Sequence, residues 1–424
     1  MKTKYDLIVV GGGFAGTAAA IEAARQGTDV LLIEKYNCLG GAAAYALVSP
    51  FMAFWTHIGE DKKRQNLAGD LFLEIVDEAM KLTARSEDTP MIRDALFDEE
   101  SMKLAMLRMA RKAGVTLLFN TAVTAVTREK GTLRSVKAIC KAIDMEFFAD
   151  HFIDATGDAE LSYLAGCTCE VGREGDGQCQ PMTLCFRVGG IDKEKFTADR
   201  ARMQALYKQW QADGRIKNPR ENVLVFRNYN EGVMHFNTTR VIKKSPVDPF
   251  ALTEAEIEAR EQTYEMMHFL RSAVEGCENA RLLSTALHIG IRESRRVMGE
   301  YVLCEEDLIA LRRFEDAIAA ANYAIDIHSP DGSGTRFQEF SDGEWYEIPY
   351  RALLPKGFDN LLVAGRCISS THEAQASYRI MPFCAELGQA AGCAVAVAKR
   401  SGRNARTVNV KDVQAILRTK GFVI

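Results

Sequence analysis

The sequence lacks the features of a nucleic-acid-binding or membrane protein. Its 53 lysines and arginines stand against 57 aspartates and glutamates over 424 residues, so the formal net charge is −4. No basic excess is present to attract nucleic acid or an anionic membrane. The first apolar run, residues 5–10, is too short to cross a bilayer, and no signal-peptide cleavage region follows it. We therefore expect a cytoplasmic protein that binds neither partner.

Metal-site patterns and repeats are also missing. The 11 cysteines are scattered, and the densest group is Cys167, Cys169, Cys179 and Cys185. That group has no C-x-x-C pair and no histidine at zinc spacing, so we predict no metal site and mostly buried free thiols. There is no internal repeat, low-complexity segment or heptad pattern. A chain of this length holds two or three domains.

A glycine-rich loop near the start is the most informative motif. Gly11, Gly13 and Gly16 have the G-x-G-x-x-G spacing between a predicted strand (residues 5–10) and a predicted helix (residues 17–25). The first glycine permits a tight turn, the second a close approach to phosphate, and the third close helix–strand packing. The helix N-terminus offers unpaired N–H groups to a pyrophosphate. The same loop contains Gly12, Phe14 and Ala15.

Glu34 makes this loop specific for a dinucleotide. It follows a second apolar strand, residues 30–33, after a helix that ends near Gly27. A carboxylate at that position accepts hydrogen bonds from both hydroxyls of an adenosine ribose and repels a 2′-phosphate. We therefore predict a dinucleotide site rather than a βαβ unit that binds nothing.

The rest of the chain predicts an α/β protein with a discontinuous nucleotide-binding domain. Four strand-like runs follow, at residues 115–119, 121–128, 133–139 and 146–154. Near the end of the sequence come another strand-like run, at 360–366, and a helix rich in small residues, at 383–399. We expect a parallel sheet plus a β-meander of Rossmann type, built from residues 1–165 and 346–424. Residues 166–345 would form an inserted α+β substrate domain. It would contain helices over 197–213, 253–274 and 305–324 and a β-like segment over 182–188.

Four separated motifs give the chain a family resemblance. They are the loop at 11–16 with Glu34, Leu39-Gly40-Gly41, residues 152–158, and residues 362–366 with 388–392. Their order resembles the FAD-dependent oxidoreductases of the glutathione-reductase-like superfamily. Further stretches look like a bacterial group within it: residues 180–184, 291–296, 325–328 and 379–382. The resemblance implies FAD as the cofactor.

The resemblance also implies which residues hold FAD. The loop glycines would hold the pyrophosphate, and Glu34 the adenosine ribose. A helix starting at Gly388 would direct N–H groups at the N1/O2 edge of the flavin, where reduced flavin gathers negative charge. The other implied cofactor residues are Lys35, Gly40, Gly41, Ala42, Val123 (through its backbone to adenine), Ala155, Thr156, Gly157, Asp158, Gly365, Arg366, Gln389, Ala390 and Ala391.

Two motifs of the superfamily are missing from this sequence, and their absence limits the redox reactions that we expect. Its disulfide reductases carry a C-x-x-x-x-C pair after the Gly-Gly loop, whereas residues 41–48 contain no cysteine, so dithiol chemistry on that pattern is excluded. No second G-x-G-x-x-G follows a strand, so a built-in NAD(P)H domain is missing. Either the substrate reduces the flavin, or NAD(P)H or a redox protein visits.

Two histidines are the leading acid–base candidates. His328 ends a predicted strand and opens a turn, and an imidazole titrates near neutrality; hydrogen bonding to the turn is an equally weighted alternative. His235 alternates with Asn237 and Thr239 on one strand face, for which we expect solvent exposure more than a binding wall. Further candidates are His288, His372 and Arg379, the last two because they precede the expected flavin-edge helix.

An arginine cluster suggests an anion. Arg292, Arg295 and Arg296 have helical i, i+3, i+4 spacing and would share one face. Such a face meets either an anion, such as a substrate carboxylate or a flavin phosphate, or ion-pairing acids.

The sequence therefore predicts an FAD-dependent oxidoreductase that passes a hydride between a small organic substrate and flavin N5. We expect non-covalent FAD, although attachment through His57 or a cysteine stays open. The alternative is a flavin-bearing subunit that exchanges electrons with a protein partner. The acidic balance disfavours an RNA-modifying flavoenzyme.

Overall fold

The glycine loop joins the first strand of a parallel sheet to a helix. In the computed structural model, which describes residues 2–83, 96–228, 230–332 and 334–424, β1 (Lys4–Val10) leads into α1 (Phe14–Arg25) and β2 (Val30–Ile33). β2 pairs in parallel with β1 and, at its other edge, with β5 (Thr116–Leu118). All of β2 is buried, which explains its unbroken apolar sequence.

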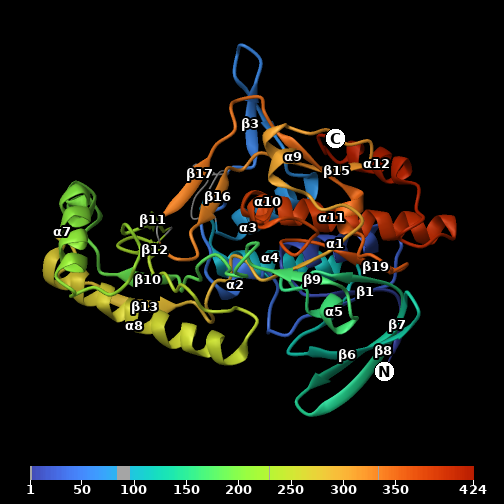
Figure 1. The fold of residues 1–424 in the computed structure, drawn as a ribbon, viewed down its shortest axis with the longest axis horizontal. Coiled ribbons are helices and arrows are strands. Elements are labelled where there is room, and N and C mark those ends of the chain that lie inside the picture. Colours follow the sequence, from blue (N-terminus) through green and yellow to red (C-terminus); the bar gives the residue numbers. More distant parts are fainter. Residues whose placement is uncertain (1, 84–95, 229, 333) are drawn as a thin grey trace.

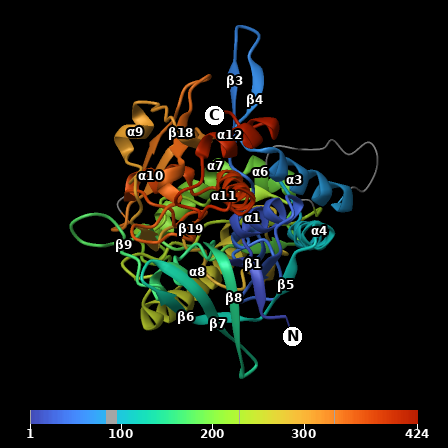
Figure 2. The ribbon, with the colours of Figure 1, turned by 90° about the vertical axis from the view of Figure 1, so that its right-hand side faces the viewer.

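β8 (Ile143–Asp154) joins this parallel sheet to the meander. Its first half pairs antiparallel with β7 (Thr132–Cys140), which pairs in turn with β6 (Ala122–Glu129). Its last residues pair in parallel with β1 on one edge and with β19 (Leu361–Val363) on the other. The predicted α/β fold, with a parallel sheet and a meander built from both ends of the chain, is confirmed (Figures 1 and 2).

Two helices from opposite ends of the chain pack tightly over this sheet. A Cβ on Gly388 of α11 (Met381–Ser401) would lie 1.9 Å from the carbonyl oxygen of Ala15, and one on Gly392 would lie 2.2 Å from that of Ala19. Glycine is therefore required where α11 meets α1. Among the described residues, α11 alone is long and apolar enough to cross a membrane, and its apolar window is fully buried in the protein. Three more helices pack nearby: α3 (Asp70–Thr83), α4 (Glu99–Lys112) and α12 (Val410–Thr419).

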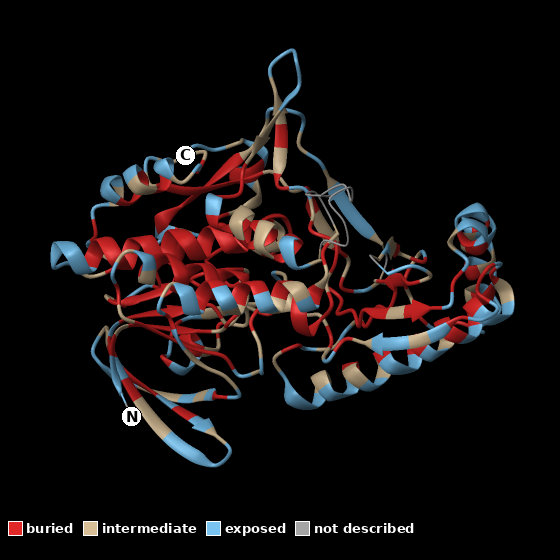
Figure 3. Ribbon diagram, turned by 180° about the vertical axis from the view of Figure 1, so that it is seen from behind, coloured by how far each residue is buried: buried red, intermediate tan, exposed pale blue. Residues whose placement is uncertain are grey.

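The middle of the chain forms a lobe with its own core. Its antiparallel sheet has the order β11 (Val225–Arg227), β12 (Met234–Phe236), β10 (Phe186–Gly189) and β13 (Arg281–Thr285). Helices cover it: α6 (Lys193–Ala198), α7 (Arg200–Ala212) and α8 (Pro249–Ala273). The stacked rings of Phe186 and Phe236 lie in this core, which is separate from the main one (Figure 3). The predicted helices near 197–213 and 253–274 are confirmed, while the domain boundaries at 165 and 346 stay a prediction.

The predicted helix over residues 305–324 is wrong. Only α9 (Glu305–Ile309) is helical, and Leu311 then adopts a φ of 50°. β15 (Ala317–Ala321) follows as a strand that pairs antiparallel with β18 (Tyr346–Pro349). Every residue of β15 is buried and the strand packs against α11, so tertiary burial outweighs the helix propensity of its alanines.

Smaller elements complete the fold. Short antiparallel pairs join β3 to β4, β9 to β14 and β16 to β17. Their bounds and those of the remaining elements are β3 (Trp55–Ile58), β4 (Lys63–Asn66), β9 (Cys169–Val171), β14 (Arg295–Val297), β16 (Ile325–His328), β17 (Thr335–Gln338), α2 (Ala42–Tyr45), α5 (Glu160–Leu164), α10 (His372–Tyr378) and the 3-10 helix η1 (Tyr350–Leu353).

Candidate active site

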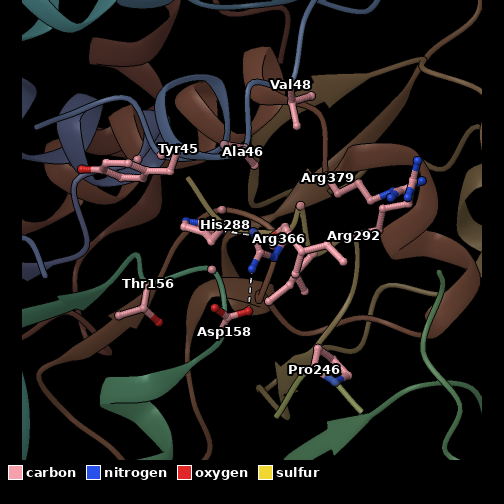
Figure 4. A pocket seen from close by; sticks show the side chains of 18 of the residues that line it. Tyr45, Ala46, Val48, Thr156, Asp158, Pro246, His288, Arg292, Arg366 and Arg379 are labelled. Atoms are coloured by element: carbon pink, nitrogen blue, oxygen red, sulfur yellow. Dashed lines mark hydrogen bonds and ion pairs between the residues drawn. The ribbon is translucent and has the colours of Figure 1, made fainter. Parts of the chain in front are cut away.

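A cavity of about 760 Å³ is lined by the carboxyl ends of parallel strands, at Val10 and Ile33, and by residues of the lobe. Figure 4 shows some of the side chains that line it. Its wall combines residues of the main core, such as Val10 and Phe14, with residues of the lobe, such as Leu224 and Phe226. The lining residues fall within the ranges 10–15, 33–36, 41–52, 121–123, 155–160, 183–185, 220–226, 237–256, 288–295, 323–328, 365–366 and 379–384. A crevice beyond the strand ends is where open α/β sheets bind nucleotides.

The glycine loop has the geometry of a phosphate cradle. Gly11 has a φ of +101°, and a Cβ there would lie 2.5 Å from the carbonyl oxygen of Ala155. A Cβ on Gly16 would lie 1.8 Å from the carbonyl oxygen of Gly11. Gly13, the N-cap of α1, lines the cavity and has no crowding neighbour. The first-turn amides of α1 have no intrahelical acceptors, so this end of the helix suits a pyrophosphate.

Glu34 lies beside the cradle. It is 5% exposed and lines the cavity, and its two oxygens accept from the backbone amides of Gly12, at 2.5 Å, and Tyr36, at 2.8 Å. Burial raises the pKa of Glu34 despite these two hydrogen bonds. The amides fix the carboxylate at the strand end and leave each oxygen able to accept another hydrogen bond.

The ion pair between Arg366 and Asp158 forms another part of the cavity wall. Arg366 donates to Asp158, whose Oδ1 also accepts from the Ser294 hydroxyl at 2.6 Å (Figure 4). Burial alone would raise the pKa of Asp158, but the charges of Arg366 and Lys35 outweigh it and lower that pKa. The preceding turn is held by buried Asp154, which accepts from Thr156 and Ser162. The pair is therefore a fixed, charged part of the cavity.

The helix end that faces the cavity differs from the predicted one. α11 begins at Met381, and Ile380 and Met381 line the cavity. Gly388 lies in the helix interior, where amides are hydrogen-bonded, so the expectation that residues 388–391 start the helix is wrong. Gln389 instead donates to Glu22 and Asp70, at 2.9 and 2.6 Å. Pro382 in the first turn is the sequence signal for the true start.

Three aromatic side chains share one part of the wall: the candidate His288 and two tyrosines that were not predicted, Tyr36 and Tyr45. The ring centroids of Tyr36 and Tyr45 are 4.2 Å apart, and the His288 ring stacks on Tyr36 at 5.0 Å. All three residues line the cavity. Tyr36 and Tyr45 flank the Gly-Gly loop, but His288 is more than 240 residues away in the sequence, so periodicity gave no sign of the cluster.

His328 lies in the cavity wall but does not titrate near neutrality. Its Nδ1 is 3.2 Å from Nη2 of Arg240, which is always a donor, so Nδ1 accepts and the proton resides on Nε2, 3.4 Å from Asp326. Burial, together with the charge of Arg292, lowers the pKa of His328 to about 3. His328 is therefore neutral at pH 7, and its predicted titration near neutrality is wrong.

Two arginines lie side by side next to His328. Nη1 of Arg292 donates to the carbonyl of Pro181 and the hydroxyl of Thr183, both at 2.7 Å. Arg379 donates to the carbonyl of Asp326 at 3.0 Å, and its guanidinium lies near that of Arg292 (Figure 4). Asp326 also accepts from Tyr323 at 3.3 Å. This part of the cavity wall is thus polar and rich in guanidinium groups, which distinguishes it from the glycine cradle.

A family model for FAD dependent oxidoreductases matches residues 6–417. The chain belongs to this family. Its cofactor is FAD, and it is an enzyme. The glycine cradle, the Glu34 carboxylate and the N-terminus of α11 fit that cofactor, because they offer a diphosphate site, a ribose acceptor and a positive helix end around one cavity.

Similarity to individual proteins is local. The chain is 30% identical over 139 residues to digeranylgeranylglycerophospholipid reductase 1 of Methanococcoides burtonii, covering 32% of this chain and 34% of that protein. It is 58% identical over 41 residues to vinyl phenol reductase of Lactiplantibacillus plantarum, covering 10% and 8%. The structure of a geranylgeranyl bacteriochlorophyll reductase-like protein from Thermoplasma acidophilum matches with a TM-score of 0.49 at 13% identity, covering 99% and 85%. The aligned part is thus about a third of the first relative.

Of the other residues that the sequence suggested for the active site of this flavoenzyme, some line the cavity and others are buried elsewhere. Arg295 lines the cavity, with its guanidinium 4.3 Å from the Tyr163 ring centroid. Arg296 is buried, with Glu293 as its ion-pair partner. The two belong to strand β14, where neighbouring side chains point to opposite faces, so the predicted shared helical face is wrong.

His235 is buried on the sheet face opposite the lobe core, beside Arg187 and Phe226, rather than exposed. It is 1% exposed and does not line the cavity, and within the described residues neither ring nitrogen has a hydrogen-bond partner. Burial, with the charge of Arg187, lowers its pKa to about 3. The expectation that this strand face is exposed is therefore wrong. His372 is also outside the cavity lining, in contact with buried Glu293 at 2.8 Å.

The residues considered for covalent attachment and for metal binding have other surroundings. His57 lies in β3, outside the cavity lining, 3.2 Å from Asp342. Cys185 and Cys384 do line the cavity, and burial raises the pKa of both thiols to about 12. Within the described residues, no three histidine, cysteine, aspartate or glutamate side chains gather into a metal site.

Proposed function

We propose that this FAD-dependent oxidoreductase transfers a hydride between a small organic substrate and N5 of the flavin. The observation that carries the proposal is one continuous cavity that joins the glycine cradle to a polar end formed by Arg292, Arg379, Tyr323 and Asp326. Bound FAD supplies the hydride acceptor or donor. The chain places the substrate against it and excludes water.

The protein side chains have distinct roles in this proposal. Residues of the cradle, Glu34 and the turn at 155–158 hold the cofactor, and the start of α11 at Met381 stabilises negative charge on the reduced flavin. Arg292 and Arg379 orient the substrate. Because His328 is neutral and hydrogen-bonded by Arg240, its role is to hold that arginine and Asp326 in place, not to exchange a proton at neutral pH.

Electrons enter or leave through the substrate, through NAD(P)H or through a visiting redox protein. Purified protein is first tested for visible flavin absorbance with and without added FAD, and flavin bleaching is then followed by stopped flow against organic metabolites, NADH and NADPH. We expect rapid bleaching or reoxidation by one class of organic compound. A protein that stays colourless after FAD is added refutes the proposal. Fast exchange only with a co-purifying protein would instead support an electron-transfer subunit.

A further inference from the structure

We infer that the arginine end of the cavity binds the carboxylate of a small, otherwise apolar substrate, and that Arg220 and Arg292 are its ligands. The inference deepens the proposed function and rests on it, since it names the class of compound that would meet the flavin. Arg220 was not among the residues selected from the sequence.

Arg220 is a buried cation whose side chain makes no ion pair with the described residues. It is 5% exposed and lines the cavity, and its Nε and Nη1 atoms are buried without a hydrogen-bond partner in the part of the chain that the structure describes. Its backbone is fixed, because its carbonyl accepts from Gln211 at 2.8 Å and its amide donates to Asn218 at 3.1 Å. An unpaired buried charge is strongly unfavourable. A rigidly placed guanidinium of this kind is therefore preorganised for an anion that enters the cavity.

Arg292 presents the second half of the same site. Its Nη1 is occupied by Pro181 and Thr183, whereas Nε and Nη2 have no acceptor within the described part of the chain. Both Arg220 and Arg292 act electrostatically on the buried thiol of Cys185, which lines the cavity too. Both arginines and Cys185 line the same cavity, and Arg292 keeps an open donor edge there.

Positive charge is in excess around this region. The charged groups with the largest effects on the pKa values of Arg220, Arg292 and His328 are Arg220, Arg240, Arg292, Arg379, Glu221 and Asp326. Glu221 pairs with Arg240 and Asp326 with Arg379, so neither carboxylate is reserved for Arg220 or Arg292, and neutral His328 adds no charge. Burial first, and then the neighbouring arginines, lower the pKa of Arg292 to about 9 and that of Arg220 to about 10. An anion placed among them would relieve this repulsion.

The surrounding wall indicates the kind of anion. Apolar side chains line the same cavity, among them Val48, Leu224, Phe226 and Pro246. A phosphate or sulfate would leave these groups without a contact, whereas a carboxylate on an aliphatic or aromatic body would use both. Guanidinium forks match planar carboxylates in a bidentate arrangement. The combination favours an amphipathic carboxylic acid.

The test is calorimetric titration of the FAD-loaded protein at constant ionic strength. The probes are benzoate and hexanoate, each compared with its neutral amide, and inorganic phosphate. Three proteins are compared: wild type, Arg220→Met and Arg227→Met. Arg227 is an exposed arginine on the adjoining strand β11 and does not line the cavity, so its variant makes the same change in charge outside the site.

We expect at least one acid to bind wild type at least tenfold more tightly than its amide and than phosphate. Arg220→Met should weaken that acid at least tenfold with a Tm at or above wild type, because it removes a buried unpaired charge, and Arg227→Met should change affinity less than twofold. Equal binding of acid and amide, equal binding of phosphate, no binding of either acid, or a lower Tm with unchanged affinity overturns the inference. Loss of FAD in Arg220→Met would assign Arg220 to the cofactor instead. Because flavin loading and bleaching are measured separately, failure of the proposed function is distinguishable from failure of this site.

Discussion

At the residue scale, the protein holds several buried ionisable groups whose charged forms are poorly compensated. Arg220 and Arg292 line the cavity, whereas His235 is enclosed between the lobe sheet and its neighbours, outside the cavity lining. This difference in location determines whether a bound ligand can compensate the charge of each group. A group facing a cavity can be compensated by a ligand, but an enclosed group can only remain neutral.

His235 should make the protein sensitive to acid. Its folded pKa of about 3 lies below the ordinary value of 6.5, so the unfolded state binds the extra proton, and its contribution to stability is lost as pH falls below 6.5. At pH 5 this costs about 2 kcal/mol. We expect His235→Leu to match wild type in the free energy of unfolding at pH 7 and to fall less steeply toward pH 5 in urea titrations. Parallel pH profiles for the two proteins would contradict this expectation.

Arg292 should set the alkaline limit of carboxylate binding. The ligand prefers the protonated guanidinium, so affinity should be flat below pH 9 and weaken above it, by up to tenfold per pH unit. Arg220, with a pKa of about 10, lines the same cavity and makes the loss of affinity above pH 9 steeper. The other charged neighbours of Arg292 include Arg379 and Asp326, which form an ion pair with each other. Calorimetry with benzoate or hexanoate from pH 7 to 10 measures this. The corresponding amide should show no such dependence, and affinity that rises above pH 9 would exclude the assignment.

At the element scale, the glycines have two different functions. Gly388 permits contact between α11 and α1, whereas Gly13 keeps the cavity side of the cradle open. The substitution of alanine separates these functions, because the added methyl group overlaps a backbone carbonyl at Gly388 but makes only an ordinary van der Waals contact at Gly13.

Gly388→Ala should destabilise the protein by about 1–3 kcal/mol, since its methyl group would overlap Ala15. The matched variant Gly13→Ala should cost under about 1 kcal/mol, because the nearest atom to its methyl group is 3.7 Å away. We expect Gly13→Ala instead to weaken FAD at least tenfold by filling the approach to the phosphates. Urea unfolding of the apoprotein and FAD titration report the two effects. Equal losses of stability would refute the distinction.

Elements with an unambiguous pattern could be predicted from the sequence. The buried strands at 30–33 and 146–154 and the helix near 253–274 follow from apolar runs and helical periodicity. The strand at 317–321 could not, because its alanines favour a helix and only pairing with β18 decides otherwise. The arginines at 295 and 296 were misread for the same reason, since pairing with β9 makes that segment a strand.

At the scale of the whole molecule, the two ends of the cavity differ in how far the sequence reveals them. The cofactor end is formed by local motifs, each recognisable alone, such as the loop at 11–16. The arginine end brings together Arg220, Arg292 and Arg379 from three distant segments, and only the fold places them in one wall. Arg220 carried no signal because it lies in a loop without a motif.

Because the main core and the lobe both contribute residues to the cavity wall, ligand binding should be visible in both parts of the protein. We expect saturating benzoate or hexanoate, whichever binds, to slow hydrogen exchange in residues 218–226 and 288–292 of the FAD-loaded protein. At a ligand concentration of about 100 Kd the slowing reaches about a hundredfold for segments that open only in the free protein. α12 lies outside the cavity lining and should not change. Protection confined to α12, or protection equally strong with the amide, would contradict the location of the site.

The pairing of β8 has a consequence for synthesis on the ribosome. Its final residues need β19 as a neighbour, which is encoded about 200 residues later, and α1 needs α11 as its cover, which is encoded about 360 residues later. A nascent chain that stops before residue 361 exposes an open strand edge and an uncovered apolar helix. The cofactor pocket is therefore completed late in translation, and until α11 emerges the growing chain exposes apolar surface.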